Sequence, residues 1–315
     1  MKNSPCPCVV VILPAYNEEL TIAQTIQSFW HAMPGAEIVI VDNNSSDATD
    51  KIARNTLLSL GARGRVIKEQ RQGKGNAVRR AFTDVDADIY VLADADMTYP
   101  ADQAAVLIQP IIDGDADMVV GDRLSEGHYQ RENKRRFHNF GNQLVTRLIN
   151  RLFASRLSDI MSGYRAFSRK FIKNYPILVE GFQLETDMTL HALDKRFRIL
   201  EIPIPYQDRP AGSFSKLNTF RDGARVISTI AQIMRYYRPM VFFGTLALLF
   251  GLAGVISAIP VLNDWIERRY IYHLPLAVLA AALEIVAVLS LGIGLVLDSI
   301  THQHRMNSER RLLGD

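Results

Sequence analysis

Two aspartates, Asp94 and Asp96, stand one residue apart in the stretch VLADADMTYP, directly after an apolar run. In an extended chain, residues i and i+2 point to the same face, so this spacing predicts that the two carboxylates lie side by side. Two like charges that close repel each other unless a positive charge lies between them, and a divalent cation would supply that charge. The alternative is a polar strand end, without a bound ion, followed by a helix that begins at Pro100.

The elements that must position these aspartates alternate between strand and helix. Five apolar runs predict strands, at residues 8–16, 36–42, 64–69, 87–94 and 116–123, and helical patterns lie between them. Such units predict an α/β fold with a mainly parallel sheet and helices on both faces. Ligands of these sheets bind at the carboxyl ends of the strands. The polar residues expected there are Pro14–Asn17, Asp42, Asp94, Asp96 and Arg123.

The glycine pattern argues against two common nucleotide-binding sites. A dinucleotide-binding fold requires G-x-G-x-x-G after its first strand, but the first strand here is followed by PAYNEE, which contains no glycine. Gly73 and Gly75 in QGKGNAV lack the third glycine, and they also lack the G-K-[ST] ending of a phosphate-binding P-loop. Neither a dehydrogenase nor a P-loop NTPase is therefore expected.

Composition narrows the class of protein further. The 315-residue chain contains two cysteines, Cys6 and Cys8, which are too few for a zinc site and predict free thiols in a reducing compartment. The formal net charge of +3 does not by itself indicate a partner, and we expect no nucleic-acid binding. The placement of the basic residues is more informative than their number.

Two stretches are long and apolar enough to cross a membrane as helices. Residues 240–262 carry no charge, and residues 274–297 carry only Glu284. Each exceeds the roughly 20 residues that a hydrocarbon core requires, and buried core helices are usually shorter and amphipathic. Arginines flank the two spans on one side, so the positive-inside rule predicts a cell-membrane protein with a cytoplasmic catalytic domain and cytoplasmic termini. The N-terminus lacks the hydrophobic core of a signal sequence.

Two further segments combine basic residues with apolar residues at helical spacing. Residues 133–153 contain five lysines and arginines and no acid, with apolar residues at helical spacing from Phe137 to Leu148. Residues 216–238 repeat the pattern before the first apolar span. Basic amphipathic helices are typical of membrane surfaces with anionic headgroups. The alternative is a packed helix with a solvated polar face.

A set of short motifs, in order, carries a resemblance to a known family. Between residues 9 and 217 the chain contains ILPAYNEE, VDNNSSDATD, QGKGNAVRRAF, LADADMTYP, VVGDR, SDIMSGYRAFSRK and RPAGSFSKL. The set resembles the glycosyltransferase family 2 enzymes with the GT-A fold. It is most similar to their membrane-bound polyprenyl-phosphate branch, which includes dolichyl-phosphate mannosyltransferase and bactoprenol glucosyltransferases. The resemblance implies an enzyme that moves a sugar from a nucleotide sugar to a polyprenyl phosphate lipid at the membrane.

The resemblance also implies a donor site and a metal site. The donor-binding residues are expected to be Pro14, Ala15, Tyr16, Glu18, Asp42, Lys74, Asp94 and Ala95. Asp42 matches the position that binds the base, and a carboxylate there accepts the imide N–H of uracil and of guanine alike, so UDP and GDP stay open. Asp94, Asp96 and Thr98 match the ligands of Mg²⁺ or Mn²⁺, although many relatives have Gln or Ser where Thr98 stands.

For the acceptor phosphate, the resemblance implies a cationic site and direct displacement with inversion. Its residues are Arg123, Arg136, Arg209, Ser215 and Lys216, with Ser213 as a further hydroxyl. Asp96, Arg123 and Asp159 are the expected catalytic residues, and Asp159 would orient the acceptor or stabilise positive charge on the sugar ring. The alternative for Asp159 is a helix cap. Glu185 and Asp187 are weaker candidates that would orient neighbouring basic groups.

Three other functions remain as alternatives. A family 2 polysaccharide polymerase usually carries Q-x-x-R-W and more spans, whereas this chain has only QIMRYY. A transferase acting on a diglyceride would keep the membrane and change the acceptor, and an inactive membrane scaffold would have lost the carboxylates. The sugar, the polyprenol length, the oligomeric state, a homo-oligomer included, and the downstream pathway stay open.

The predicted organisation has four parts: a catalytic domain over residues 1–215, an interface helix over 216–238, a transmembrane hairpin over 239–300 and a basic tail over 301–315.

Overall fold

The structure is a computed structural model of the chain and describes residues 7–124, 136–179, 184–205 and 222–314. The chain forms two compact units, Met1–Thr219 and Phe220–Asp315. The predicted boundary after residue 215 lies outside the described residues and stays a prediction.

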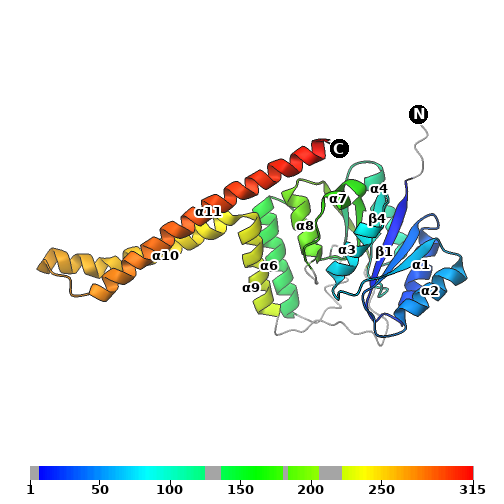
Figure 1. Cartoon of the computed structure of the whole chain (residues 1–315), viewed down its shortest axis with the longest axis horizontal. Helices are drawn as coiled ribbons and strands as arrows, with labels where there is room; N and C mark the ends of the chain where they lie inside the picture. The colour runs from blue at the N-terminus through cyan, green and yellow to red at the C-terminus, as the bar shows by residue number, and fades with distance from the viewer. Residues whose placement is uncertain (1–6, 125–135, 180–183, 206–221, 315) are drawn as a thin grey trace. The chain divides into compact units, whose positions relative to one another are not determined.

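The first unit is built on a sheet whose seven described strands have the order β3-β2-β1-β4-β6-β5-β7 (Figure 1). The strands are β1 (Val9–Ala15), β2 (Glu37–Asp42), β3 (Gly64–Lys68), β4 (Ile89–Leu92), β5 (Met118–Asp122), β6 (Arg165–Ser168) and β7 (Ile199–Pro203). Every pair is parallel except those of β6, which runs antiparallel to β4 and β5. The predicted α/β class and mainly parallel sheet are confirmed. All five predicted strands form, whereas β6 and β7 were not predicted.

The central strands are covered on both faces, which explains their continuous apolar sequences. Val11 and Leu13 of β1 belong to a core that also contains Ile26 and Phe29 of α1. Val10 and Ile12 of β1 point to the opposite face and are equally buried. The helices of this unit are α1 (Ile22–Ala32), α2 (Thr49–Leu60), α3 (Lys74–Asp84), η1 (Ala101–Gln103), α4 (Ala104–Ile112), α6 (Arg136–Phe153), α7 (Arg169–Asn174) and α8 (Leu184–Asp194).

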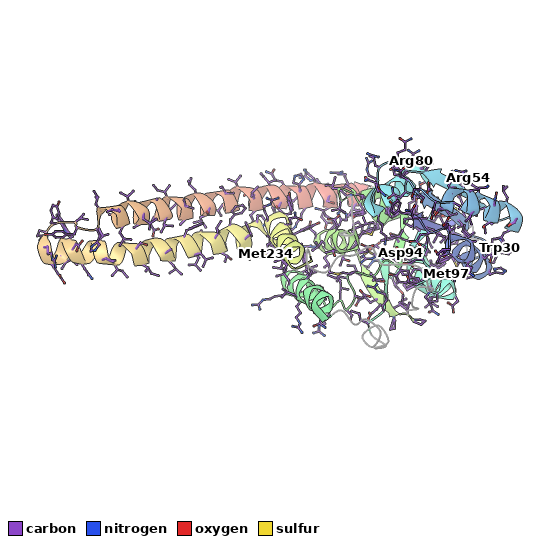
Figure 2. The ribbon with its side chains drawn as sticks, turned by 90° about the horizontal axis from the view of Figure 1, so that it is seen from below. Trp30, Arg54, Arg80, Asp94, Met97 and Met234 are labelled. Carbon is purple, nitrogen blue, oxygen red and sulfur yellow. The ribbon has the colours of Figure 1, made fainter. Side chains whose placement is uncertain are left out.

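The second unit is helical and consists of α9 (Asp222–Tyr237), α10 (Pro239–Arg268) and α11 (Leu274–Gly314). Helices α10 and α11 form a hairpin, and Figure 2 shows their side chains projecting outward along its length. By length and composition alone, both are able to cross a membrane, and their most apolar windows are only 6% and 17% buried.

Both helices run beyond the predicted spans. Helix α10 ends at Arg268 rather than near residue 262, so part of the predicted loop is helical. The turn that follows is held by Asp264, whose carboxylate accepts hydrogen bonds from the backbone N–H groups of Tyr272 and His273. Helix α11 continues through the predicted basic tail because residues 298–312 contain no glycine or proline to end it.

Candidate active site

The carboxyl ends of the parallel strands bring the predicted donor residues to one edge of the sheet. Ala15 at the end of β1 is in register with Asp42 at the end of β2, and Arg123 directly follows β5. Because β6 runs antiparallel, its first residue, Arg165, pairs with Leu92 at the end of β4. The segment that precedes β6 therefore reaches the same edge, which adds residues 158–164 to the site.

One feature of the predicted metal site was wrong. Strand β4 ends at Leu92, and the chain turns at Ala95 and Asp96, so the side-chain alternation of an extended strand does not reach Asp94 and Asp96. The two carboxylates make separate contacts. The side chain of Asp94 is 29% exposed, whereas Asp96 is 3% exposed.

The partly exposed Asp94 forms an ion pair with Lys74, and Lys74 pairs in turn with Glu185. Lys74 Nζ lies 2.5 Å from Asp94 Oδ1 and 2.6 Å from Glu185 Oε1. Burial alone would lower the pKa of Lys74, but the two carboxylates outweigh burial and raise this pKa above its ordinary value. The ammonium group, with its side chain 14% exposed, is therefore held charged between α3 and α8, and Glu185 contacts a basic group as the sequence suggested.

Backbone geometry explains why glycines flank this ion pair. Gly73, immediately before Lys74, has φ 131°, which L side chains rarely adopt. Gly163 lies on the other side, where an added Cβ would be 3.0 Å from both Asp94 Oδ2 and Lys74 Nζ. These two positions allow the backbone to approach the cluster closely.

Asp96 is held by Thr98, two residues later. The Thr98 hydroxyl and the Thr98 backbone N–H donate to Asp96 Oδ1, over 2.6 and 3.1 Å. The turn itself is anchored at Ala95, whose carbonyl accepts hydrogen bonds from the hydroxyls of Thr21 and Thr25 at 2.8 and 3.1 Å. Thr98 thus orients the buried carboxylate in this structure.

The donor set partly fits a divalent cation. Carboxylate oxygens are the ligands that Mg²⁺ and Mn²⁺ prefer, and Asp94 reaches the surface of the unit. Within the described ranges, however, no group of three His, Cys, Asp or Glu side chains comes together as a ready-made metal site. A bound ion would therefore need further oxygens from water or from a phosphate, as is usual for Mg²⁺.

Asp42 presents an oxygen that the described residues leave unsatisfied. This side chain is 1% exposed, and its Oδ1 accepts a 3.3 Å hydrogen bond from the backbone N–H of Ser45. Its buried Oδ2 has no hydrogen-bond partner in the described part of the chain. A buried carboxylate oxygen without a donor is costly, so Asp42 is suited to receive an N–H group from a ligand.

The loops beside Asp42 are tied to each other. Asn17, at φ 53°, accepts a 2.8 Å hydrogen bond from Ser46 N–H and donates its own N–H to Ser45 Oγ at 3.0 Å. Glu18 donates its backbone N–H to the Thr49 hydroxyl at 2.9 Å. Of the predicted donor residues, Pro14 and Ala15 therefore end strand β1, while Tyr16 and Glu18 follow it in the loop that these hydrogen bonds fix.

Asn43 is a positioning residue that the sequence interpretation missed. Its side-chain oxygen accepts from Gly73 N–H at 2.7 Å, and its amide donates to the Arg71 carbonyl at 2.7 Å. These bonds join the end of β2 to the loop that carries Lys74. The signal was present in VDNNSSD, where an amide side chain directly follows the predicted base-binding aspartate.

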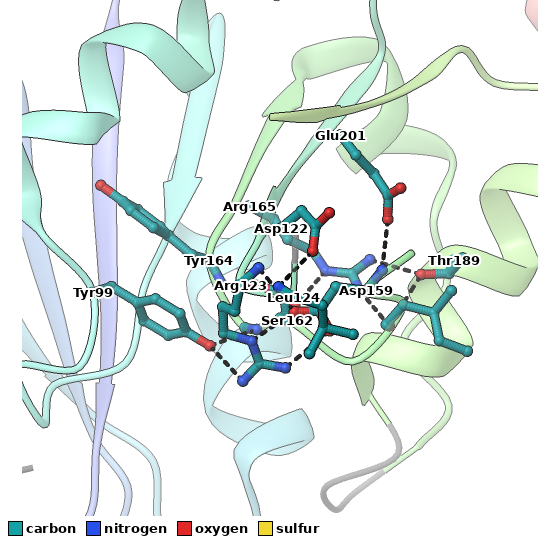
Figure 3. A network of polar contacts seen from close by, with 12 residues as sticks. Tyr99, Asp122, Arg123, Leu124, Asp159, Ser162, Tyr164, Arg165, Thr189 and Glu201 are labelled. Carbon is teal, nitrogen blue, oxygen red and sulfur yellow. Dashed lines mark hydrogen bonds and ion pairs between the residues drawn. The ribbon is translucent and has the colours of Figure 1, made fainter. Parts of the chain in front are cut away.

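Arg123 and Asp159 form the second charged pair, shown in Figure 3. Arg123 donates from Nε and Nη2 to the two Asp159 oxygens at 2.7 and 2.9 Å, and its backbone N–H also donates to Oδ2 at 3.2 Å. On the other side, Arg123 Nη1 lies 3.4 Å from the Tyr99 hydroxyl. Glu201 fixes the Asp159 loop by accepting the backbone N–H groups of Ser158 and Asp159 at 2.7 and 2.9 Å.

Tyr99 links the two charged pairs. Its hydroxyl accepts from Gly163 N–H at 2.9 Å, next to the Lys74 cluster, and from Arg123 at the second pair. Burial raises the pKa of Tyr99, so this group stays a neutral hydroxyl at physiological pH. Tyr99 was not predicted as a site residue, because a tyrosine before a proline carries no sequence signal for this contact.

Arg165 holds the segment before β6 from beneath. The side chain is completely buried and donates to the carbonyls of Ile160 and Ser162 at 2.7 and 2.8 Å and to the Thr189 hydroxyl at 2.9 Å. These bonds fix the loop that carries Asp159 and Gly163. Arg165 was missed because a charged residue at the start of a strand is ordinarily read as surface.

The predicted acceptor-phosphate residues mostly lie beyond the described part. Arg209, Ser213, Ser215 and Lys216 fall in residues 206–221, outside the described residues, and Arg136 is the first residue of α6, with its side chain also outside them. Of the predicted acceptor set, the structure places Arg123 in the site. Asp187 accepts a 2.8 Å hydrogen bond from the Tyr175 hydroxyl.

Residues 10–175 match the model of the family described as "Glycosyl transferase family 2". The chain belongs to glycosyl transferase family 2. This family 2 glycosyltransferase is 30% identical over 311 residues to "Glycosyltransferase AglJ" of Haloferax volcanii, a match that covers 97% of this chain and 98% of that protein. It is 33% identical over 226 residues to the "Dolichyl-phosphate hexose transferase" of the same organism, covering 71% and 93%. The predicted family and enzyme class are confirmed.

Solved structures confirm the GT-A fold of the enzyme. The M. tuberculosis glucosyl-3-phosphoglycerate synthase shares 23% identity, and the match covers 72% of this chain and 80% of that chain with a TM-score of 0.55. Another structure of that synthase, a complex with Mn²⁺, UDP-glucose and phosphoglyceric acid, matches with the same identity and TM-score and covers 72% and 79%. At this identity the likeness concerns the fold alone.

Proposed function

We propose that this family 2 glycosyltransferase moves a sugar from a UDP- or GDP-sugar to a polyprenyl phosphate at the cytoplasmic face of the membrane, with inversion at the anomeric carbon. The observation that carries the proposal is the joining, in one chain, of the Asp42–Lys74–Asp94 edge with two helices of membrane-crossing length. The relative named for dolichyl-phosphate hexose transfer supports the same acceptor class.

Asp42 is the proposed contact for the nucleobase. Uracil and guanine each present an imide N–H, and the buried Oδ2 of Asp42 has no donor among the described residues. A hydrogen bond to a charged acceptor is worth about 1.5–3 kcal/mol, enough to anchor the base at the end of β2. The neighbouring loop of Pro14–Glu18 would line the base and ribose.

The donor diphosphate gains charge when its bond to the sugar breaks, and the site offers two sources of compensation. Asp94 and Asp96, with Thr98, would hold Mg²⁺ or Mn²⁺; when bound, the ion offsets charge on the phosphate oxygens. Lys74 stands at the first position of α3, where the helix dipole also favours an anion. Glu185 keeps this ammonium near the phosphates by pairing with it.

The acceptor phosphate requires positive charge rather than a base. A phosphate monoester already carries about −1.5 to −2 charges near pH 7, because its second pKa is about 6. Its oxygen attacks the anomeric carbon, and the bond from that carbon to the nucleotide diphosphate breaks. Arg123 would meet the acceptor phosphate, since an arginine fork suits phosphate oxygens. Arg136, Arg209, Ser215 and Lys216 remain predicted members of this site.

Asp159 takes a positioning role in this proposal. Both of its oxygens accept from Arg123, and its loop is fixed by Glu201. Burial raises the pKa of Glu201, while the two backbone N–H bonds that it accepts act in the opposite direction. Asp159 would therefore set the direction of the Arg123 guanidinium, a role that differs from the helix cap considered from the sequence.

The test is a transfer assay with the purified full chain in detergent, polyprenyl phosphate and a panel of radiolabelled UDP- and GDP-sugars. We expect a lipid product that is labile to mild acid, as a phosphodiester-linked sugar is, and that disappears on addition of EDTA. Asp96→Ala is expected to lower the rate at least about 100-fold, the cost of roughly 2.7 kcal/mol of transition-state stabilisation.

Each failure has a separate meaning. An acid-stable glycolipid product would indicate that the acceptor is a diglyceride and not a polyprenyl phosphate. Full activity in EDTA would show that the reaction does not require a metal ion. Nucleotide binding without any product would favour an inactive scaffold. Asp50→Asn, on the exposed face of α2 in a pair with Arg54, is the matched control and is expected to retain the wild-type rate.

A further inference from the structure

Glu284 is an acidic residue within the second apolar stretch of an otherwise uncharged helix hairpin. Residues 240–262 of α10 contain no charge, and within residues 274–297 of α11 Glu284 stands alone as an ionisable residue. At 1.5 Å per residue, Glu284 lies about 15 Å along α11 from Leu274, which is near the middle of a hydrocarbon core of about 30 Å. If the hairpin crosses the membrane, as proposed above, this carboxyl lies at its centre.

The side chain packs across the hairpin rather than away from it. A Cβ added at Gly254 of α10 would be 2.6 Å from Glu284 Oε1 and 3.0 Å from its Cδ, and one at Gly251 would be 4.0 Å from Oε2. The two glycines therefore leave a notch in α10 that receives the carboxyl group. Figure 2 shows the two helices running side by side over this stretch.

The notch does not satisfy the carboxyl. In the part of the chain that the structure describes, Glu284 makes no hydrogen bond or ion pair, and its side chain remains exposed at the hairpin surface. A polar group without a partner in hydrocarbon is costly, and such residues in membrane helices face a partner or a water-filled cavity. Neither apolar stretch contains a lysine or arginine that could pair with it.

A second carboxyl at the same depth is a fitting partner. A carboxyl group accepts hydrogen bonds and, in its acid form, also donates one, so two identical groups complement each other. A twofold axis through such a pair would bring the same face of both hairpins together. That face carries the small, exposed Ala281 one turn before Glu284, and the exposed Val288 one turn after it. Small residues allow membrane helices to approach closely.

We propose that the Glu284 face of the hairpin, formed by Ala281, Glu284 and Val288 of α11 with Gly251 and Val255 of α10, is the interface with a second copy of this chain. The two Glu284 carboxyls hydrogen bond to each other across the interface. The inference rests on the membrane crossing of the proposed function and is independent of the sugar chemistry.

The experiment places full-length protein in 3:1 POPE/POPG vesicles at a low protein-to-lipid ratio and counts chains per assembly by single-molecule photobleaching. Glu284→Leu, which keeps the bulk in the glycine notch, is expected to weaken association at least tenfold. Glu284→Gln, whose amide also donates and accepts, is expected to retain it within about threefold. Leu279→Ala on another face of α11 is the matched control and should associate as wild type does.

A second measurement keeps the proposal open to refutation if Glu284→Leu inserts poorly. With Cys6 and Cys8 replaced by serine, Val288→Cys is expected to form an inter-chain disulfide under mild oxidation, and Leu279→Cys is not. Monomeric wild-type protein at all ratios, or association of Glu284→Leu equal to that of wild type, would overturn the proposal. Sugar transfer measured on the same vesicles separates these outcomes from a failure of the proposed reaction, and flotation of the vesicles with the protein checks membrane insertion.

Discussion

At the residue scale, the site consists of cations held by carboxylates that come from distant parts of the chain. Asp94 and Glu185 both pair with Lys74, and Asp159 holds Arg123 through a hydrogen bond from each of two guanidinium nitrogens. Each cation is thereby directed before any ligand arrives, which reduces the reorganisation required during reaction. Asp42 differs from these groups, because one of its buried oxygens has no donor in the described residues.

The unsatisfied oxygen of Asp42 predicts nucleotide affinity. Asp42→Ala removes a charged acceptor worth about 1.5–3 kcal/mol, so the Kd for the cognate nucleoside diphosphate should rise about 10- to 100-fold. Isothermal titration calorimetry of UDP and GDP in detergent measures this change and also identifies the donor base. Asp50→Asn is the control. Equal affinity of Asp42→Ala and wild type for both nucleotides would show that Asp42 does not bind the base.

The pairing of Glu185 with Lys74 predicts a positioning effect. Glu185→Gln should lower kcat/KM about 10-fold or more, because Lys74 loses the partner that directs it toward the donor phosphates. Lys74→Met should cost about 3 kcal/mol of unfolding free energy, since it leaves the buried Glu185 and the partly exposed Asp94 without their cation.

Denaturant unfolding and donor-saturation kinetics measure these two effects. Adding Glu185→Gln to Lys74→Met is expected to recover part of the lost stability, because the double variant buries one carboxylate fewer. Asp187→Ala, which loses the Tyr175 contact instead, should retain wild-type kcat/KM. Unchanged kinetics of the Glu185→Gln enzyme would show that Lys74 does not depend on Glu185 for its position.

At the element scale, the antiparallel strand β6 assembles the second half of the site. A parallel strand in its place would have delivered residues 158–164 to the opposite edge of the sheet. The antiparallel direction instead carries Asp159 and Gly163 to the carboxyl ends of β4 and β5. Helix α8 then supplies Glu185 from its first turn and His191 from its last.

Close backbone approach at the start of β6 predicts an effect of added bulk. Gly163→Ala would place a Cβ 3.0 Å from Asp94 Oδ2 and Lys74 Nζ, so the ion pair must shift by a few tenths of an ångström. We expect kcat to fall about 10-fold while the melting temperature changes by only a few degrees. Gly35→Ala, where nothing lies within 4 Å, is the matched control, and a Gly163→Ala enzyme with wild-type kcat would contradict the contact.

His191 of α8 predicts a pH dependence of stability. Its ring lies among Phe171, Tyr175 and Phe197, and burial followed by the charge of Lys195 lowers its pKa to about 4. The unfolded chain binds a proton near pH 6.5, so this contribution is fully present above pH 6.5 and is lost as the pH falls toward 4. The loss is at most about 3 kcal/mol.

Denaturant unfolding of wild type and His191→Phe from pH 7.5 to 4.5 isolates this contribution. The difference in unfolding free energy between the two proteins should shift in favour of the variant as the pH falls. A difference that stays constant over this range would show that His191 does not titrate differently in the two states.

At the scale of the whole molecule, a family 2 catalytic unit and a helical unit with two membrane-length helices share one chain. The windows of α10 and α11 that are most apolar have little buried area inside their own unit. Exposed apolar helices of this length indicate a lipid environment rather than water. The arginine distribution then predicts which side of the membrane each end occupies.

This topology is testable by cysteine labelling in intact cells. In a Cys6→Ser, Cys8→Ser background, a membrane-impermeant maleimide should label Tyr270→Cys in the hairpin turn, where the native side chain is 62% exposed. Asn307→Cys near the end of α11 should be labelled only after permeabilisation. Labelling of Asn307→Cys in intact cells would invert the predicted orientation.

The sequence by itself determined the strand–helix alternation, the place of Asp42 and Arg123 at strand ends and the two apolar helices. These features depend on local periodicity and on residue type, which the order of residues records directly. Asp42, Lys74 and Asp94 could be named because each follows or precedes a predictable element. The ends of α10 and α11 were predicted less well, since no strong helix breaker marks them.

Only the tertiary structure decided which charges meet. Lys74 and Glu185 are 111 residues apart, and their contact depends on the antiparallel insertion of β6 and on the placement of α8, neither of which has a long apolar signal. The same reason hid Tyr99 and Glu201, whose roles are hydrogen bonds to distant backbone, and the contact of Arg165 with Thr189. The turn that begins after β4 also gives Asp94 and Asp96 separate contacts, with Lys74 and with Thr98, which the alternation of an extended strand does not predict.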